Sequence, residues 1–251
     1  YRRKKIMKVL VIGCGHCGGR IADEFARVSM RAHVQHGIDI TTGVFAVNTD
    51  ITDLTGLSYI KRDPQHRILM GGQKTGGHGV GKINEIGAEV ARDDSDKVIN
   101  GIRECSEFPE TDAFLLVSSA AGGTGSGTIP ILTQELKEHY FEKPVYNLIV
   151  LPFRYEELTE ERTVYNTATC LKSAYLVADA IFLIDNHRYI RKHVSVRDNF
   201  RRINTAVVES FYDLLCAGEQ KKPEYIGGKL LDAGDIMETL LGWTAIGHGK
   251  A

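Results

Sequence analysis

The chain has 251 residues, of which 43% are hydrophobic and 25% charged, and its formal net charge at pH 7 is −1. This composition is typical of a globular protein with a sizeable core and excludes an intrinsically disordered chain. The balanced charge gives no broad field that would attract nucleic acid or an anionic membrane. No apolar run reaches the roughly 18 residues of a transmembrane helix, so we expect membrane contact only through adaptors. Five cysteines without framework spacing suit a reducing cytoplasm.

Apolar runs alternate with helical patterns along the chain. The runs are rich in β-branched or aromatic residues, and each ends in Gly, Ser, Asn, Asp or Pro, which is typical of strands buried on both faces. They cover residues 8–13, 43–50, 113–120, 145–153 and 180–186. Segment 197–216 places Phe200, Ile203, Val207, Phe211 and Leu214 three or four residues apart, which predicts a long amphipathic helix. The alternation predicts an α/β fold with a parallel sheet and ligands at the carboxyl ends of its strands.

Two glycine-rich loops each follow a predicted strand and precede a predicted helix. The first, GCGHCGG at 13–19, suits a dinucleotide, a mononucleotide or a tight turn. The second, SSAAGGTGSGT at 118–128, interleaves glycines with hydroxyls, which predicts a nest of backbone N–H groups for phosphate. Glycine costs conformational entropy, and we expect no structural requirement for so many in the second loop. The absence of a G-x-x-x-x-G-K-[ST] motif excludes a P-loop NTPase.

The two loops together resemble the tubulin/FtsZ superfamily of GTPases, and the similarity extends over nearly the whole chain. AVNTD at 46–50 and GGHGVG at 76–81 resemble two further nucleotide loops of that superfamily. Among its branches, the sequences GHGVG, PVY and AGE are most similar to the archaeal CetZ family. The resemblance implies a Rossmann-like parallel-sheet GTPase domain of tubulin/FtsZ type, a long central helix and the start of a second α+β domain.

The resemblance also implies a binding site for GTP or GDP with Mg²⁺. Asn48 and Asp50 are implied to lie near the terminal phosphate and its magnesium ion, Asp50 through water, and Gly76–Gly81 are implied to sense the γ-phosphate. The residues implied for nucleotide binding in these loops are Gly13, Gly15, His16, Cys17, Gly18, Gly19, Arg20, Asn48, Asp50, Gly76, Gly77, Gly79, Gly122, Gly123, Thr124, Gly125, Ser126 and Gly127.

Three further residues are implied to hold the guanine base. Asn186 and Asn204 resemble the residues that read guanine, and Phe200, one turn before Asn204, is placed to cover the base. An asparagine amide offers the guanine edge both a donor and an acceptor. From the residues alone, a strand-end turn for Asn186 and a solvent-facing helix position for Asn204 are the plain alternatives.

A glutamate after Pro152 is implied to hold the ribose. Glu156, Glu157, Glu160 and Glu161 all compete for this role, and we favour Glu161.

Two aspartates follow the polar connector at 218–228. Asp232 and Asp235 are three residues apart and share a helix face. The resemblance implies that they reach the nucleotide of the next subunit in a filament and complete hydrolysis by orienting water. From the residues alone, a helix N-cap and a first-turn acid are the plain alternative. Leu230 stands where an FtsZ-type loop carries asparagine, which puts water positioning by that amide in doubt.

We expect a GTP-binding domain over 7–196, the long central helix over 197–217, and over 218–251 a catalytic loop, a helix and the start of a C-terminal domain. Met7 is a plausible native start, and the end at Ala251 indicates part of something longer. The function implied is a cytoplasmic, tubulin-like cytoskeletal GTPase that polymerises head to tail with itself and controls archaeal cell shape or motility.

Two other functions compete with this one. A nucleotide-sensing scaffold that does not polymerise would need the glycine loops but not Asp232 and Asp235. A dinucleotide-dependent oxidoreductase would end its second strand in an acid some 20 residues after the first loop, whereas that strand ends about 35 residues after Gly13. Cys14-x-x-Cys17 with His16 lacks the further ligands that a zinc site needs.

Overall fold

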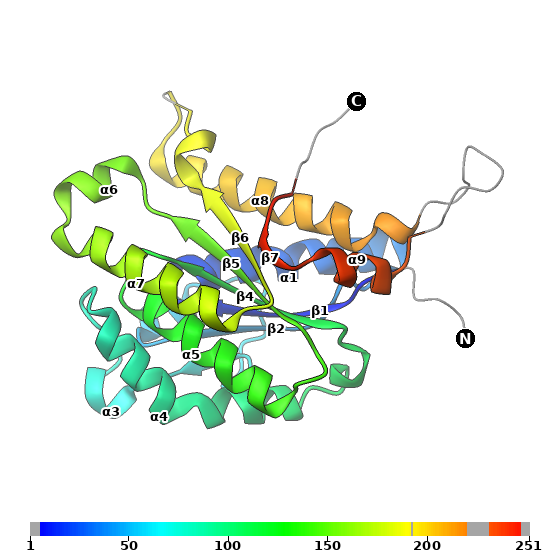
Figure 1. The fold of residues 1–251 in the computed structure, drawn as a ribbon, viewed down its shortest axis with the longest axis horizontal. Helices are drawn as coiled ribbons and strands as arrows, with labels where there is room; N and C mark the ends of the chain where they lie inside the picture. Colours follow the sequence, from blue (N-terminus) through cyan, green and yellow to red (C-terminus); the bar gives the residue numbers. More distant parts are fainter. Residues whose placement is uncertain (1–5, 192, 220–230, 247–251) are drawn as a thin grey trace.

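The computed structural model describes residues 6–191, 193–219 and 231–246. Within them, one parallel sheet has the strand order β3-β2-β1-β4-β5-β6-β7 (Figure 1). Its strands are β1 Val9–Cys14, β2 Thr41–Asn48, β3 Arg67–Leu69, β4 Ala113–Ser119, β5 Val145–Leu151, β6 Ala180–Asp185 and β7 Gly242–Thr244. The predicted Rossmann-like α/β architecture is confirmed.

Helices cover both faces of this sheet (Figure 1). The α-helices are α1 Gly15–His36, α2 Ile51–Thr55, α3 Gly72–Thr75, α4 Asn84–Arg103, α5 Thr124–His139, α6 Arg154–Thr159, α7 Glu161–Val177, α8 Val196–Leu215 and α9 Ala233–Thr239. Short 3₁₀ turns are η1 Phe108–Glu110, η2 Asn186–Tyr189 and η3 Ala217–Glu219. None of these helices is both long and apolar enough to cross a membrane.

The two faces of the sheet bury separate cores. Val9 and Val11 of β1 pack with α1, α8 and α9, whereas Leu10 and Ile12 pack with α4, α5 and α7. Successive strand residues point to opposite faces, so a strand covered on both sides must be apolar throughout. This is the physical reason for the continuous apolar runs in the sequence.

The chain reverses its winding direction between β1 and β4. These strands are adjacent in the sheet, although β2 and β3 come between them in sequence. In open α/β sheets, such a switch point opens a crevice at the carboxyl ends of the strands. The two glycine loops follow β1 and β4, so the topology brings them side by side.

Helix α8 carries the apolar stripe that the sequence predicts, with one change at each end. Ile203, Val207 and Phe211 are buried against the sheet. At the C-terminal end Leu215, rather than Leu214, is fully buried. At the N-terminal end Phe200 is 40% exposed, whereas the sequence pattern placed it on the buried stripe.

The described part of segment 218–251 completes the first sheet. Strand β7 pairs in parallel with β6, and Ala233, Ile236 and Leu240 of the α9 region join the core under α8. Residues 231–246 therefore extend the same sheet, and the start of a C-terminal domain within 218–251 stays a prediction. Leu230 lies outside the described residues.

Candidate functional site

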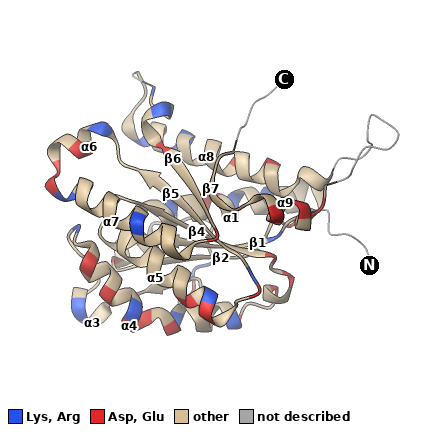
Figure 2. Ribbon diagram, in the orientation of Figure 1, with Lys and Arg blue, Asp and Glu red and all other residues tan. Residues whose placement is uncertain are grey.

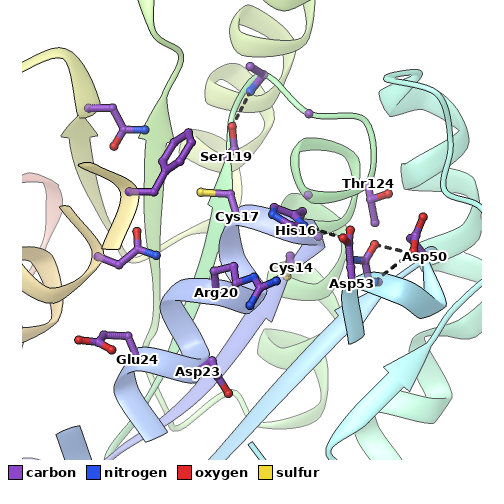
Figure 3. A pocket seen from close by; sticks show the side chains of 18 of the residues that line it. Cys14, His16, Cys17, Arg20, Asp23, Glu24, Asp50, Asp53, Ser119 and Thr124 are labelled. Atoms are coloured by element: carbon purple, nitrogen blue, oxygen red, sulfur yellow. Dashed lines mark hydrogen bonds and ion pairs between the residues drawn. The ribbon is translucent and has the colours of Figure 1, made fainter. Parts of the chain in front are cut away.

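A cleft of about 1460 Å³ lies at the carboxyl edge of the sheet, above the switch point (Figure 3). Its volume exceeds the roughly 300–1,000 Å³ common for small-molecule sites. The predicted residues on its wall are Gly15, His16, Cys17, Arg20, Asn48, Asp50, Gly79, Gly122, Gly123, Thr124, Gly125, Asn186, Phe200 and Asn204. The structure thus gathers residues of the predicted nucleotide domain and of the predicted long helix into one cavity.

Several predicted residues do not line the cleft. They are Gly13, Gly18, Gly19, Gly76, Gly77, Ser126, Gly127 and Glu161. A β-carbon on Gly18 would lie 2.0 Å from the carbonyl oxygen of Val117, and one on Gly127 would lie 2.1 Å from that of Asn84. These glycines allow a helix to approach its neighbouring backbone closely. The expectation that packing requires few glycines in the second loop is therefore wrong for Gly127.

The two glycine loops touch each other backbone to backbone. Gly15 has φ +72°, and a β-carbon on it would lie 2.8 Å from the amide nitrogen of Gly125. A β-carbon on Gly125 would lie 2.7 Å from the carbonyl oxygen of Cys14, whereas one on Gly122 would meet open space. Helices α1 and α5 begin at this junction. Their first-turn N–H groups and positive dipole ends make the floor of the cleft suitable for an anion.

The segment that follows β2 forms a further wall of the cleft. Thr49 and Thr124 share a hydrogen bond between their hydroxyl oxygens, 2.6 Å apart. Asn48 Oδ1 accepts from the amides of Thr49 and Asp50, at 2.8 and 3.2 Å. Asp50 Oδ1 caps α2 by accepting from the amides of Thr52 and Asp53, at 2.8 and 3.1 Å. These bonds fix the orientation of the Asp50 carboxylate at the rim.

The glycine-rich segment 76–81 lies against this wall. The amide of Gly79 donates a hydrogen bond to the carbonyl oxygen of Thr49 at 3.0 Å. The backbones of Asp50 and His78 form an isolated antiparallel β-bridge. Of the three glycines predicted here, Gly79 reaches the cleft, whereas a β-carbon on Gly77 would meet Ile51 of α2 and one on Gly76 would meet His78.

Asp53 is a cleft residue that the sequence analysis missed. Its Oδ1 lies 2.6 Å from His16 Nδ1, and its Oδ2 accepts from Asn48 Nδ2 at 3.0 Å (Figure 3). The Asp50-x-x-Asp53 spacing at a helix start is the signal that would have drawn attention to it.

Asp23 is a second missed residue on the cleft wall. This carboxylate is 7% exposed and accepts from the amides of Ser58, Tyr59 and Ile60 at 2.7 to 3.1 Å. It holds the segment after α2 against α1. The only sign of this role in the sequence is that an acid stands beside the buried face of a predicted helix.

The other end of the cleft has an aromatic and amide character. The ring of Phe200 meets that of Phe153 edge to face, with centroids 5.5 Å apart. Asn186 is 7% exposed, and its Oδ1 has no hydrogen-bond partner among the described residues. A buried polar atom without a partner is costly, so this oxygen is suited to a donor on a ligand. Asn204 lies on the same wall, one turn after Phe200.

The structure places Glu156 on the cleft wall and leaves Glu161 away from it. Glu156 lies in the first turn of α6, and its Oε2 accepts from the amide of Phe153 at 2.8 Å. Glu160 forms an ion pair with Lys82. The position of Glu156, just after β5, explains its proximity to the strand ends, whereas Glu161 begins the next helix.

The cysteines of the first loop stay protonated at neutral pH. Burial, with a smaller contribution from the Glu156 carboxylate, raises the pKa of Cys17 to about 12. Burial also raises the pKa of Cys14, which lies in the core beneath α5. Across residues 6–191, 193–219 and 231–246, no three His, Cys, Asp or Glu residues are grouped to hold a metal ion.

Asp232 and Asp235 do not line the cleft. They form a reciprocal capping box at the start of α9, with N···O distances of 3.0 and 3.1 Å. Helix α9 lies beside the C-terminal end of α8 (Figure 1). The cleft lies at the N-terminal end of α8.

The fold and the cleft define a doubly wound α/β protein whose switch point is shaped for a ligand with an anionic end and a planar end. Residues 8–192 match the Tubulin/FtsZ family, GTPase domain. The chain belongs to this family, as its resemblance predicts.

Solved structures and curated relatives agree with this assignment. The chain is 35% identical over 238 residues to "Tubulin-like protein CetZ1" of Haloferax volcanii, covering 94% of this chain and 57% of that protein. It superposes on "CetZ1 from Haloferax volcanii - GDP bound monomer" with TM-score 0.82 and 32% identity, covering 94% of this chain and 66% of that one. It also superposes on the GTPγS-bound protofilament of CetZ2 from the same organism with TM-score 0.80 and 30% identity. This match covers 94% of this chain and 64% of that one. The chain thus spans under two thirds of the length of these relatives.

Proposed function

We propose that this protein is a cytoplasmic, tubulin-like cytoskeletal GTPase that binds GTP or GDP and polymerises head to tail. Similarity to CetZ1 with bound GDP and to a CetZ2 protofilament with bound GTPγS supports both parts. By the same similarity, we propose a role in archaeal cell shape or motility. The protein itself is the proposed partner, and membrane contact would need an adaptor.

The cleft supports a guanine nucleotide in one orientation. The phosphates would lie over Gly15, Gly122 and Gly125, where two helix N-termini supply N–H donors. The base would lie at the other end, beside Phe200 and the unsatisfied Oδ1 of Asn186. This oxygen carries the proposal for the base, because guanine presents N–H donors on its edge. Asn204 would supply the second amide and Glu156 would hold the ribose.

Magnesium fits this arrangement through Asp50. One of its carboxylate oxygens caps α2, and the other lies on the side of Gly79. Mg²⁺ prefers oxygen ligands and keeps several waters when it binds a nucleotide. We propose that Asp50 holds the hydrated ion beside the phosphates. The bound ion would neutralise charge that develops on the phosphate oxygens during hydrolysis.

Hydrolysis is proposed to be assembled between subunits. Helix α8 has 20 residues, which corresponds to about 30 Å, and it separates the cleft from α9. Asp232 and Asp235 therefore lie far from the nucleotide of their own subunit. Figure 2 shows acidic residues at α9, which would face the nucleotide of the next molecule in a head-to-tail contact. Such a heterologous contact propagates into a filament.

A nucleotide-sensing scaffold is the second candidate, and one observation favours it. Asp232 and Asp235 already stabilise the start of α9 through their reciprocal hydrogen bonds. This role would account for both residues without any catalysis.

GTP turnover at several protein concentrations distinguishes the two candidates. A shared site predicts that turnover per molecule rises with concentration, and a scaffold predicts little turnover at any concentration. Asp235→Asn should bind GTP normally, hydrolyse it poorly and form persistent polymers. Glu238→Gln, on an exposed position of the same helix, is the matched control.

Mixing two variants provides a second test of the shared hydrolysis site. Gly122→Trp should block the cleft without disturbing the core, because a side chain at this position enters open space. Mixing it with Asp235→Asn should restore part of the turnover, since each variant supplies the half-site that the other lacks. Full activity of Asp235→Asn alone, or turnover per molecule independent of concentration, would contradict the shared site. Calorimetry that detects NAD binding but no guanine nucleotide would overturn the proposed function.

A further inference from the structure

A buried asparagine that does not line the cleft holds two of the loops that form it. Asn166 of α7 is fully buried and lies outside the cleft lining. Its Nδ2 donates to the carbonyl oxygens of Ala121 and Gly122 in the second glycine loop, at 3.0 and 3.4 Å. It also donates to the carbonyl oxygen of Lys82, directly after segment 76–81, at 2.9 Å. Because all three partners are acceptors, the NH₂ group of the side chain must face them.

These hydrogen bonds set the direction of the peptide groups in the second glycine loop. In a planar trans peptide, the carbonyl and the following N–H point in opposite directions. The Ala121 carbonyl faces Asn166, so the N–H of Gly122 points away from Asn166. The Gly122 carbonyl is held by Asn166 and by the hydroxyl of Ser126. The N–H of Gly123 therefore points away from Asn166 as well. Both glycines line the cleft, and neither amide has an acceptor in the part of the chain that the structure describes.

The third hydrogen bond from Asn166 holds a strained residue. Lys82 has φ +63°, and among the described residues it is the only non-glycine residue with a positive φ. This left-handed conformation is costly for a lysine and persists only when the surrounding structure holds it. Asn166 binds the carbonyl oxygen of Lys82, and the side chain of Lys82 pairs with Glu160. The path of the chain between segment 76–81 and α4 is thus held in part by Asn166.

We propose that Asn166 is a positioning residue for the phosphate chain of the bound nucleotide. By holding the carbonyl oxygens of Ala121 and Gly122, it keeps them away from the phosphates. The N–H groups of Gly122 and Gly123 are thereby presented to the phosphates. Phosphate oxygens accept hydrogen bonds from such amides and repel a carbonyl oxygen, so the direction of these peptides decides between attraction and repulsion. The inference rests on the proposed binding of GTP or GDP.

The experiment compares GDP, with Mg²⁺, and guanosine, which has the same base and ribose but no phosphate. Asn166→Leu gives a side chain of similar size without hydrogen-bonding groups. It should weaken GDP binding by about tenfold or more, the cost of one charge-assisted hydrogen bond. Guanosine affinity should stay the same, because Asn186, Phe200 and Asn204 lie at the other end of the cleft. Titrations followed by NMR measure both affinities, since NMR also detects weak binding.

The matched control is Asn147→Leu. Asn147 of β5 is as buried as Asn166, and its Oδ1 accepts from the hydroxyl of Thr133 at 2.9 Å, but it does not line the cleft. This substitution should lower the melting temperature and leave the ratio of GDP affinity to guanosine affinity unchanged. The control thus separates a loss of stability from a loss of loop direction.

A second measurement uses the wild-type protein alone. Hydrogen exchange followed by NMR should find the side-chain NH₂ protons of Asn166 slow to exchange with and without GDP, because they are buried and hydrogen-bonded. The amide of Gly122, which has no acceptor among the described residues, should exchange fast in the free protein and slowly once GDP binds.

Equal losses of GDP and guanosine affinity in Asn166→Leu, or no loss of GDP affinity, would overturn the inference and leave the proposed function standing. Rapid exchange of the Asn166 side-chain protons, or a Gly122 amide already protected in the free protein, would do the same. Failure of the wild-type protein to bind GDP would instead reject the proposed function.

Discussion

The hydroxyl of Thr205 donates a hydrogen bond to Glu24 Oε1 at 2.6 Å, which ties α8 to α1 on the wall of the cleft. Arg27 binds both oxygens of the same carboxylate, at 2.6 and 2.8 Å. Partial burial opposes ionisation of Glu24, but the hydrogen bonds from Arg27 and Thr205 outweigh it and hold the pKa of Glu24 below its usual value. Helices α8 and α1 are thereby joined on the cleft wall through one acid.

Glu24→Gln should lower the free energy of unfolding by about 1 kcal/mol at pH 7. Because the pKa is depressed in the folded state, the stabilisation is present above the unfolded pKa and is lost as pH falls through the folded pKa. The difference between wild type and variant should therefore shrink below about pH 4.3. Urea unfolding at several pH values measures it, with Glu209→Gln as control. A difference that does not change with pH would contradict the prediction.

Gly125→Ala should destabilise the protein and weaken nucleotide binding, because its β-carbon would lie 2.7 Å from the carbonyl oxygen of Cys14. We expect a loss of about 1–3 kcal/mol, as for other overpacked sites. Gly122→Ala, three residues earlier, should leave the melting temperature unchanged, since its β-carbon meets open space. Thermal unfolding of the two variants provides the comparison. Equal melting temperatures would show that the loop junction tolerates a side chain.

Asn204→Ala should weaken GDP binding by about 1–3 kcal/mol, because a hydrogen-bonding partner of the base is lost. The loss should be smaller for an analogue whose base lacks the contacted group, such as inosine diphosphate in place of GDP. Ser210→Ala, further along α8 and outside the cleft, is the control. Unchanged GDP affinity in Asn204→Ala would mean that this residue only occupies the helix surface.

Asp23→Ala should lower stability by about 1–3 kcal/mol and speed hydrogen exchange of the amides of residues 58–60. These amides donate to the Asp23 carboxylate, and the alanine variant would leave them without that acceptor. Asp23→Asn keeps one acceptor oxygen and should lose less. Unaltered exchange in Asp23→Ala would show that other groups hold this segment.

The sheet could be predicted from the sequence because its signal is local. Runs such as residues 113–117 are apolar at every position, and burial on two faces requires that composition. The glycine loops were also found at their places between strand and helix. The roles of the individual glycines could not be predicted, because sequence spacing does not reveal that Gly18 meets Val117 or that Gly127 meets Asn84.

Side chains whose role depends on distant partners were harder to assign. Asp53 acquires its place from His16, 37 positions away in the chain, and Asp23 from backbone amides 35 to 37 positions away. The choice between Glu156 and Glu161 depended on where α6 ends and α7 begins, and helix boundaries are poorly determined by composition.

Both outermost strands of the sheet are short. In the part of the chain that the structure describes, β3 and β7 each have three residues. A short edge offers few unpaired N–H and C=O groups to another chain, which discourages growth of the sheet from one molecule into the next. In the filament proposed above, this would protect neighbouring copies from sideways, amyloid-like pairing. Association would then be left to the head-to-tail surfaces beside the nucleotide.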